Sequence, residues 1–263
     1  MAMESAAPIL DFHAARALLA WQLELGADEP VGDAPINRYE LAPTTPKVAR
    51  VPEPAAEETA GVDPVAVAEQ SVVGVTTLED LARVQAAFDL CEMKKGARNF
   101  VFADGNPKAR VMIIGEAPGR EEDLEARPFV GVAGQLLDRM FAAIGLTRGA
   151  SDPRAAFYIT NVMPWRPPSN RDPEPAEIAM MLPFLRKHVE LVAPEVIVLM
   201  GNTPCAAVLG TRGILRLRGT WATGFGRPVM PMTHPAYLLR TPAAKREAWA
   251  DLLAIKSRLN GGT

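Results

Sequence analysis

Val111-Met-Ile-Ile-Gly-Glu-Ala-Pro-Gly-Arg-Glu-Glu-Asp123 joins a short apolar run to a tight turn that carries acidic residues. The run 111–114 is typical of a fully buried strand in a parallel sheet. Two more polar loops, 160–170 and 232–240, also follow strand-like apolar runs. Because ligands of open α/β sheets bind outside the carboxyl ends of the strands, the three loops predict one site along one edge of a sheet.

Strand-like and helical segments alternate from residue 110 onward. Strands are expected at 111–114, 157–162, 196–200 and 228–232, and helices at 134–144, 175–192, 204–209 and 245–259. This alternation predicts right-handed βαβ crossovers and therefore an α/β fold. We expect a three-layer α/β/α sandwich around a central, four-stranded, mainly parallel sheet.

The first 75 residues differ from the rest of the chain. Residues 9–25 have the periodicity of an amphipathic helix that stops at Gly26, so an N-terminal helix is expected within 1–26. Residues 27–75 are acidic and rich in proline, which blocks helix and ladder hydrogen bonding, and are expected to form a linker. The main domain is expected over 76–263. The N-terminal helix could dock either onto that domain or onto a partner.

Charge is distributed unevenly along the chain. Residues 1–80 hold 14 acidic and 4 basic side chains, a balance of −10, whereas residues 81–263 hold 17 acidic and 24 basic ones, a balance of +7. A basic body with an acidic tail indicates nucleic-acid affinity, although +7 is also compatible with ordinary solubilising charge. Direct DNA contact by the acidic tail is disfavoured, because phosphates repel it.

Cysteine and histidine are scarce in this chain. Cys91 and Cys205 are expected to be reduced, buried thiols of a cytoplasmic protein, and no pair among the three histidines has zinc-ligand spacing. We therefore expect no metal site. No apolar run approaches the ~18 residues that a membrane span needs. The first residues also lack the basic segment of a secretory signal, so no membrane association is expected.

Five motifs in order carry a family resemblance. They are Gly115-Glu-Ala-Pro-Gly-Arg-Glu-Glu-Asp123, Arg127-Pro-Phe-Val-Gly131 with Ala133-Gly-Gln-Leu-Leu-Asp138, Thr160-Asn-Val162, Arg166-Pro-Pro-Ser-Asn-Arg-Asp-Pro173 and His234-Pro-Ala-Tyr-Leu-Leu239. Together they resemble the family 4 uracil-DNA glycosylases over residues 85–259. The resemblance implies a monofunctional enzyme of base excision repair that flips uracil out of DNA, hydrolyses its N-glycosidic bond, releases free uracil and leaves an abasic site. It also implies a monomer in the bacterial cytoplasm, associated with the nucleoid, with uracil-containing DNA as its partner.

Base excision requires four chemical groups, and the chain offers a candidate for each. By resemblance, Phe129 stacks on the flipped base. The Asn161 amide presents a donor and an acceptor that suit N3–H and O4 of uracil, a pattern that cytosine reverses. A neutral His234 is expected to donate to uracil O2 as negative charge builds on the leaving base. Glu116 is expected to be the catalytic carboxylate that positions water or stabilises the sugar cation.

Other residues of these loops are expected to contact the substrate. Gly115 and Gly119 allow close approach of the backbone to the nucleotide, and Ala117 is a further expected substrate contact. The resemblance implies that Glu122 lies near C5 of the base, where it would disfavour the methyl group of thymine, with Asp123 beside it. Asn170 is expected near the sugar or an ordered water. A solvated turn with helix N-cap character is the alternative reading of the acidic cluster.

The loop that follows His234 is expected to enter the minor groove of DNA. It contributes Pro235, Tyr237, Leu238, Leu239 and Arg240. Bulky side chains at a turn suit a wedge that fills the space left by a flipped base, and the choice among Tyr237, Leu238 and Leu239 stays open. Arg240 is expected near phosphate, and Arg166 is a further expected DNA contact.

The chain departs from the family at the positions of a metal cluster. By resemblance, family 4 proteins hold a four-iron cluster on four cysteines. The corresponding residues here are Phe88, Cys91, Trp165 and Met181. We predict that these four residues form a hydrophobic plug, because bulky side chains would fill the cavity left by an absent cluster. A protein without a cofactor follows. The alternative for Trp165 is a position on the surface, close to DNA.

Two other functions compete with this prediction. A catalytically weak or inactive DNA-binding module of the same fold would keep the stacking residue and the basic face, but it would not need Glu116, Asn161 and His234 together. A nucleotide-phosphate enzyme is disfavoured, because the turn lacks the Gly-Lys-Ser/Thr ending of a P-loop and its acids repel phosphate.

The loops also restrict the type of reaction. No lysine occurs in 115–123, 161–170 or 234–240, which argues against a Schiff-base lyase step. The basic, histidine-bearing insert of the related subfamily that captures uracil covalently is absent after Trp165, which argues against covalent trapping. Whether the pocket also admits other deaminated bases stays open.

Overall fold

The computed structural model describes residue 11, residue 16 and residues 63–262. The chain separates into two units, residues 1–59 and 60–263. The helix expected within 1–26 and the expected linker up to residue 62 lie outside the described residues, apart from those two positions. No helix within the described residues is long and apolar enough to cross a membrane.

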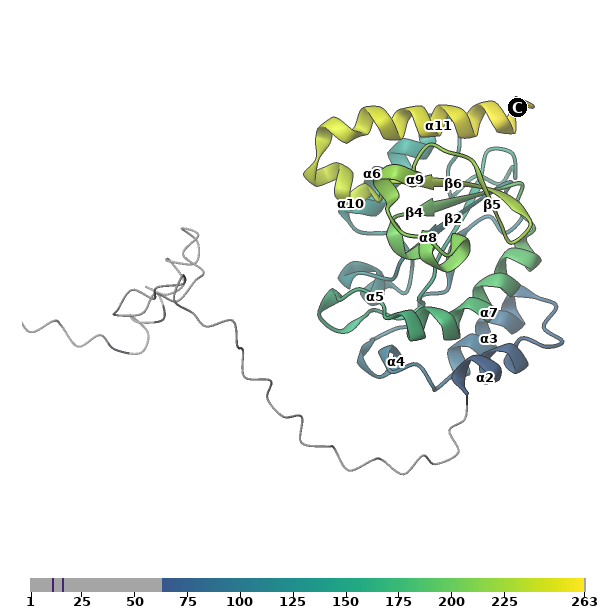
Figure 1. Cartoon of the computed structure of the whole chain (residues 1–263), viewed down its shortest axis with the longest axis vertical. Coiled ribbons are helices and arrows are strands. Elements are labelled where there is room, and N and C mark those ends of the chain that lie inside the picture. Colours follow the sequence, from purple (N-terminus) through teal and green to yellow (C-terminus); the bar gives the residue numbers. More distant parts are fainter. Residues whose placement is uncertain (1–10, 12–15, 17–62, 263) are drawn as a thin grey trace, which may run out of the picture. The chain divides into compact units, whose positions relative to one another are not determined.

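A six-stranded mixed sheet forms the middle layer of the second unit, in the order β1-β3-β2-β4-β6-β5 (Figure 1). The four inner strands are parallel: β3 (Phe157–Asn161), β2 (Val111–Gly115), β4 (Val196–Met200) and β6 (Arg227–Met232). They are the predicted strands. The predicted number of four is wrong for the whole sheet, because β1 (Ala103–Gly105) and β5 (Ala222–Gly224) add antiparallel edges.

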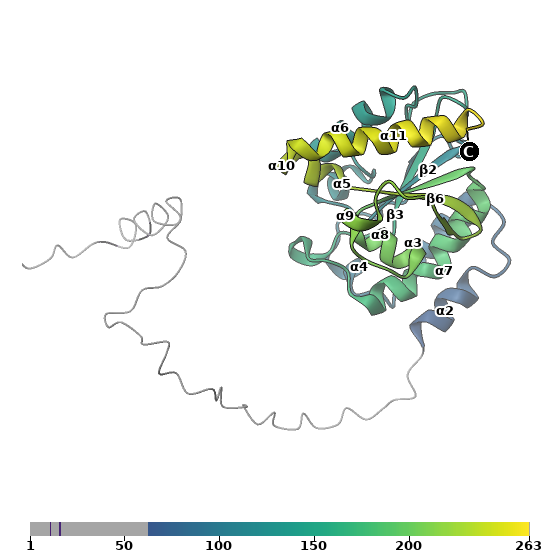
Figure 2. The same ribbon diagram turned by 45° about the horizontal axis from the view of Figure 1, so that its top comes forward.

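Helices cover both faces of the sheet and complete a three-layer α/β/α sandwich, as predicted (Figures 1 and 2). One face carries α2 (Pro64–Ser71), α3 (Leu78–Ala87), α7 (Pro175–Val192) and α8 (Asn202–Leu209), and the other carries α6 (Val132–Ala142), α10 (Pro235–Arg240) and α11 (Lys245–Leu259). Short helical turns are α4 (Met93–Gly96), α5 (Arg120–Glu125), η1 (Pro168–Asn170), α9 (Ile214–Leu217) and η2 (Pro242–Ala244).

The inner strands contribute side chains to two separate cores. In β2, Met112 and Ile114 belong to the core that includes residues of α7, whereas Val111 and Ile113 belong to the core that includes residues of α11. Successive strand residues point to opposite faces, and here both faces are covered. This is why the strand is a continuous apolar run rather than an alternating one.

The folded unit begins before residue 76, where the sequence analysis placed its start. Helix α2 packs against α7. Asp63 caps α2 by accepting a hydrogen bond from the Val65 N–H at 2.9 Å, and Pro64 occupies the first turn. An aspartate cap followed by proline is a helix-start signal. The expected linker 27–75 is therefore wrong for its last part, where proline begins a helix instead of excluding one.

The four residues of the predicted plug are buried in one core. They are Phe88, Cys91, Trp165 and Met181. Trp165 is 2% exposed, so the alternative of a surface position is wrong. The Phe88 ring packs edge-on against Phe184, with ring centroids 5.3 Å apart. A donor set with a single thiol does not fit a four-thiolate iron–sulfur cluster, and the described residues contain no group of three or more His, Cys, Asp or Glu that could hold a metal ion.

Candidate active site

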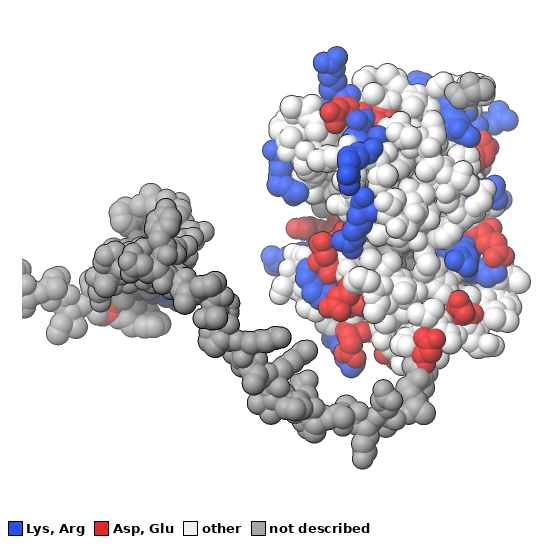
Figure 3. Space-filling view, viewed as in Figure 1, with Lys and Arg blue, Asp and Glu red and all other residues white. Residues whose placement is uncertain are grey.

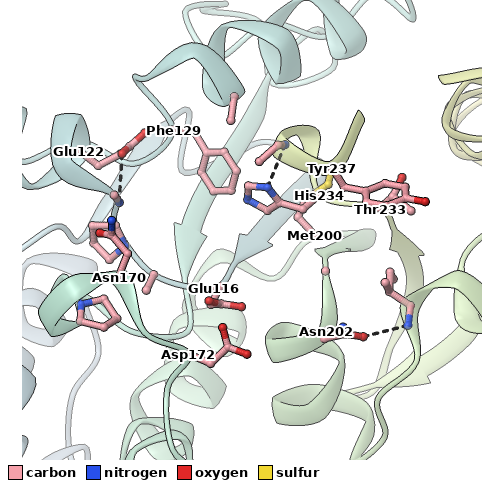
Figure 4. A pocket seen from close by; sticks show the side chains of 18 of the residues that line it. Glu116, Glu122, Phe129, Asn170, Asp172, Met200, Asn202, Thr233, His234 and Tyr237 are labelled. Carbon is pink, nitrogen blue, oxygen red and sulfur yellow. Dashed lines mark hydrogen bonds between the residues drawn. The ribbon is translucent and has the colours of Figure 1, made fainter. Parts of the chain in front are cut away.

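A cavity of about 690 Å³ opens at the carboxyl ends of the parallel strands. Glu116 and Ala117 follow β2, Met200 ends β4, and His234 follows β6, and all four residues line the cavity. The loops after β2 and β3 and the helices α9 and α10 complete its walls (Figure 4). The three polar loops of the sequence therefore do meet at one edge of the sheet.

Gly115 and Asn161 lie against Phe129, which lines the cavity, but they are not themselves among its lining residues. Gly115 and Asn161 are paired at the ends of β2 and β3. A Cβ on Gly115 would overlap Oδ1 of Asn161 and would lie 2.5 Å from the ring of Phe129. Asn161 is 6% exposed, and neither its Oδ1 nor its Nδ2 has a hydrogen-bond partner. Leaving a buried polar group unsatisfied costs about 1–3 kcal/mol, so a ligand that pairs with this amide would recover that cost.

Phe129 is held in a fixed and strained position. Its φ of 55° is uncommon for a residue other than glycine. Arg148 clamps this loop by donating to the carbonyl oxygens of Phe129, at 2.8 Å, and Pro128, at 3.0 Å. Gly134 passes so close that a Cβ there would collide with the Phe129 carbonyl. The Phe129 ring lies 5.5 Å from the His234 ring, centroid to centroid, and faces the cavity (Figure 4).

His234 presents an N–H donor to the cavity. It is the N-cap of α10, and its Nδ1 accepts a hydrogen bond from the Ala236 N–H at 3.1 Å. Burial lowers the pKa of His234 to about 4, so the ring is neutral near pH 7. Because Nδ1 accepts, the single proton of the neutral ring lies on Nε2. The expected neutral donor is therefore available at this position.

Glu116 lies beside a second carboxylate. Its Oε2 accepts a hydrogen bond from Oγ1 of Thr203 at 2.5 Å. Burial raises the pKa of Glu116, the Thr203 hydrogen bond lowers it, the charge of Asp172 raises it, and Arg212 lowers it, in decreasing order of size. Glu116 and Asp172 both line the cavity and face each other in Figure 4. Such a pair can hold a water molecule and oppose positive charge on a sugar.

Removing the Thr203 hydroxyl is expected to shift the pH dependence of catalysis. In Thr203→Val, Glu116 loses the hydrogen bond that favours its ionised form, so its already raised pKa rises further. An activity that needs the carboxylate is lost as the pH falls through that pKa. The acid limb of a kcat/KM profile should therefore move to higher pH. Thr203→Ser, which keeps the hydroxyl, should retain the wild-type limb; a shift in both variants would contradict this role.

Adding one methyl group at Gly115 is expected to disable the site. The Cβ of Gly115→Ala would displace the Asn161 amide and the Phe129 ring. A displacement of about 1 Å at reacting groups can cost 10²-fold in rate. Initial rates of base release measure the effect. Gly149→Ala is the matched control, because nothing lies within 4 Å of the Cβ that it adds. Equal rates for the two variants would contradict the proposed crowding.

Glu122 organises the loop rather than offering a free carboxylate. One oxygen accepts the Gly119 N–H at 3.1 Å, and the other accepts the N–H groups of Val130 and Gly131, both at 3.0 Å. The side chain lines the cavity, but these three hydrogen bonds already engage both oxygens of its carboxylate. It therefore ties the acidic turn to the segment that carries Phe129. The N-cap reading of the acidic cluster describes Glu122 better than direct contact with the base.

Asp123 does not bind substrate as expected. Its carboxylate is buried and accepts the N–H groups of Arg98, at 2.9 Å, and Asn99, at 3.0 Å, outside the cavity. The expectation is wrong because residues 120–125 form a helix, α5, which turns adjacent side chains in different directions.

Asn170 and Arg166 are linked to each other. Asn170 lines the cavity, and its Oδ1 accepts a hydrogen bond from Nε of Arg166 at 2.8 Å. Asn170 also adopts a φ of 53°, a left-handed conformation that asparagine tolerates well. Arg166 itself is not part of the cavity lining, so it reaches the site through Asn170.

The segment after His234 is a helix and not a loop. Pro235 is buried in the first turn of α10. Leu238 is buried in the core that includes α11, so its expected role as a wedge is wrong. Leu239 is 39% exposed, and Tyr237 and Arg240 line the cavity. The choice of wedge is therefore reduced to Tyr237 and Leu239.

Several residues of the site were missed by sequence reasoning. They are Arg148, Asp172, Asn202, Thr203 and Thr233. A signal existed for Asn202 and Thr203, because they lie two and three residues after the end of β4, at the same edge as the recognised loops. No local signal marks Arg148, which reaches the Phe129 loop from a turn beyond α6.

The fold is an α/β sandwich with a cavity at the carboxyl ends of its parallel strands. The profile of the Uracil DNA glycosylase superfamily matches residues 102–253. The chain is 37% identical over 190 residues to a "Type-4 uracil-DNA glycosylase" of Archaeoglobus fulgidus, covering 68% of this chain and 92% of that protein.

Two further proteins with the same printed name are also similar to this chain. A protein of Saccharolobus solfataricus is 37% identical over 65% of this chain and 81% of its own length. One of Thermotoga maritima is 38% identical over 57% of this chain and 77% of its own length. The chain therefore belongs to the uracil DNA glycosylase superfamily, within the family 4 group that its motifs resemble, and is a DNA glycosylase, a hydrolase of N-glycosidic bonds.

Proposed function

We propose that this chain is a monofunctional uracil-DNA glycosylase that flips uracil into the cavity, hydrolyses its N-glycosidic bond and leaves an abasic site. The single observation that carries the proposal is the buried Asn161 amide, whose donor and acceptor both lack a partner. An amide of this kind complements N3–H and O4 of uracil. The proposal includes a monomer that works without a cofactor in the cytoplasm, on nucleoid DNA.

The residues around Asn161 supply the other requirements of base recognition. Phe129, whose backbone carbonyl accepts a hydrogen bond from Arg148, offers a ring face on which a planar base can stack. Gly115 leaves room beside the amide, because any side chain there would occupy the space that Asn161 and Phe129 fill. A flipped uracil would thus stack on the Phe129 ring, and the Asn161 amide would form hydrogen bonds along one edge of the base.

Catalysis is divided between the two ends of the cavity. As the bond to the sugar breaks, negative charge develops on the base, and the Nε2–H of neutral His234 donates to O2. Positive charge develops on the sugar, and the carboxylates of Glu116 and Asp172 oppose it. The same carboxylates can orient the water that attacks C1′. The hydroxyl of Thr203 keeps Glu116 directed toward this position.

Charge on the described surface fits a DNA partner. Figure 3, in the view of Figure 1, shows lysine and arginine side chains gathered in a column over the region of α8 to α10, while acidic side chains gather below it. Arg120, Arg171 and Arg240 line the cavity itself. Basic groups around a site that is otherwise acidic can contact the phosphates on either side of a flipped nucleotide.

Release of uracil from defined DNA tests the proposal. End-labelled oligonucleotides with one uracil, opposite guanine, opposite adenine or unpaired, should show cleavage only after alkali, because a monofunctional enzyme leaves the backbone intact. Cleavage without alkali would contradict the monofunctional reaction. Intact DNA with normal binding would instead favour the inactive DNA-binding module. Strands with hypoxanthine, xanthine or ethenocytosine in place of uracil define the range of bases.

A further inference from the structure

The cavity extends beyond the proposed uracil site into a groove between two short helices. The α9–α10 groove is lined by Ile214, Leu215, Thr233, Tyr237 and Arg240. In Figure 4, Thr233 and Tyr237 lie on the side of His234 that faces away from Phe129. The groove is therefore the part of the cavity that lies away from Phe129, and none of the reaction steps described above uses it.

The floor of the groove carries an unpaired hydroxyl. Thr233 is 1% exposed, and its Oγ1 has no hydrogen-bond partner. Within the described residues, the only other buried side-chain polar atoms without a partner are the two of Asn161. Buried polar groups in folded proteins are almost always satisfied, so an exception requires an explanation. Thr233 lines the cavity and Asn161 lies close to its Phe129 wall, so a ligand that fills the cavity can supply partners to both residues.

The wall formed by α9 is rigid and presents an apolar side chain. Oδ1 of Asn202 accepts hydrogen bonds from the N–H groups of Gly213, at 3.0 Å, and Ile214, at 2.9 Å, which ties α9 to the start of α8. Leu215 is 61% exposed. Of the large apolar side chains that the described residues expose, it alone lines the cavity. An exposed leucine on a fixed turn can pack against a nucleic-acid base.

An arginine side chain lines the groove. Arg240 lines it from α10, and its charge reaches His234, where it helps to lower the pKa of the ring. Arg212 lies two residues before α9, and its charge acts on Glu116. A groove with an apolar wall, a free hydroxyl and a guanidinium group complements a nucleotide, which combines a flat base with a phosphate.

We propose that the α9–α10 groove binds the nucleotide next to the flipped uracil in the same DNA strand, with the Thr233 hydroxyl donating to its phosphate and Leu215 packing against its base. The proposal rests on the proposed function, because it takes DNA as the substrate. It adds a contact that holds the strand on one side of the flipped nucleotide.

A binding cycle with modified DNA tests this proposal. The probe is a fluorescent 19-residue single strand with one uracil nucleotide whose 2′-fluoro substituent blocks hydrolysis. Two further strands lack the base of the nucleotide on the 5′ or the 3′ side. Wild-type protein should bind one of these two strands about 10-fold more weakly, the loss expected for one stacked base. Leu215→Ala should lose about the same factor on the complete strand and nothing further on the strand without that base.

The hydroxyl and the controls complete the test. Thr233→Val should bind all strands about 10-fold more weakly, as expected for a lost hydrogen bond to a charged group, and Thr233→Ser should bind like the wild type. Leu253→Ala and Thr223→Val replace exposed residues outside the cavity and should bind like the wild type. The proposal would be overturned if removal of the neighbouring base weakened binding by the same factor in the wild type and in Leu215→Ala. Unchanged binding affinity of Thr233→Val would also overturn it. Binding does not depend on turnover, so absent uracil release would count only against the proposed function.

Discussion

Replacing Asn161 by alanine should reduce uracil release by about 10³-fold or more while DNA binding stays within a few-fold of the wild type. A site built to hydrogen-bond a ligand loses 10⁴–10⁵ in discrimination when the pairing is absent, and the amide makes both of its bonds to the base edge. Phosphate contacts supply most of the affinity for DNA and do not involve this residue. Single-turnover rates on a uracil-containing strand, together with binding to the uncleavable strand, measure the two effects separately.

Stability distinguishes this loss from a damaged fold. The Asn161 amide has no partner within the protein, so its removal breaks no intramolecular hydrogen bond. We expect the melting temperature of Asn161→Ala to be equal to or above that of the wild type, because an unsatisfied buried group is removed. A variant that melts earlier and loses activity in proportion would indicate a structural role for Asn161 and would contradict base reading.

His234→Asn should lower kcat by about 10²–10³-fold, the usual cost of removing one donor to a developing oxyanion. Asparagine is a good N-cap, so it can still accept the Ala236 N–H that Nδ1 accepts now. It cannot place an N–H where Nε2 lies. The variant therefore removes the hydrogen-bond donor but keeps the N-cap of α10. His234→Ala should lose a similar factor in kcat and also about 1 kcal/mol of stability, because it removes both functions.

The pH dependence gives a second test of the histidine. Burial lowers the pKa of His234 to about 4, so the ring gains its proton only as the pH falls through that value. The kcat of the wild type should then show no step near pH 6.5, the ordinary pKa of histidine. A step near pH 6.5 that disappears in His234→Asn would contradict a neutral donor, since it would mean that the charged ring forms during normal turnover.

The sheet could be predicted from the sequence because its inner strands are buried on both faces. Val196–Met200 is a continuous apolar run and agrees with the prediction at both ends. The edge strands β1 and β5 were missed, because each has three residues and no apolar run. Helix α2 was missed for a different reason: Pro64 was counted with the prolines of a linker, although Asp63 before it makes that proline a helix start.

The site was predictable where a residue follows a strand and less so where it lies in a helix. Glu116, Asn161 and His234 are placed by the ends of β2, β3 and β6, so their convergence follows from the topology. Asp123 and Leu238 lie within α5 and α10, where a shift of one residue changes the side chain's direction by about 100°. Thr233 looks like an ordinary strand-end residue in the sequence, and only the structure shows its unpaired hydroxyl.

The central claim is that this chain excises uracil by reading its edge with Asn161. The most direct test is the single-turnover rate of base release from three strands that differ only in carrying uracil, cytosine or thymine at one position. We expect release of uracil at least about 10³-fold faster than release of either other base, since the wrong base edge leaves the buried Asn161 amide unpaired. Release of cytosine or thymine within about tenfold of uracil, or release of none of the three, would contradict it.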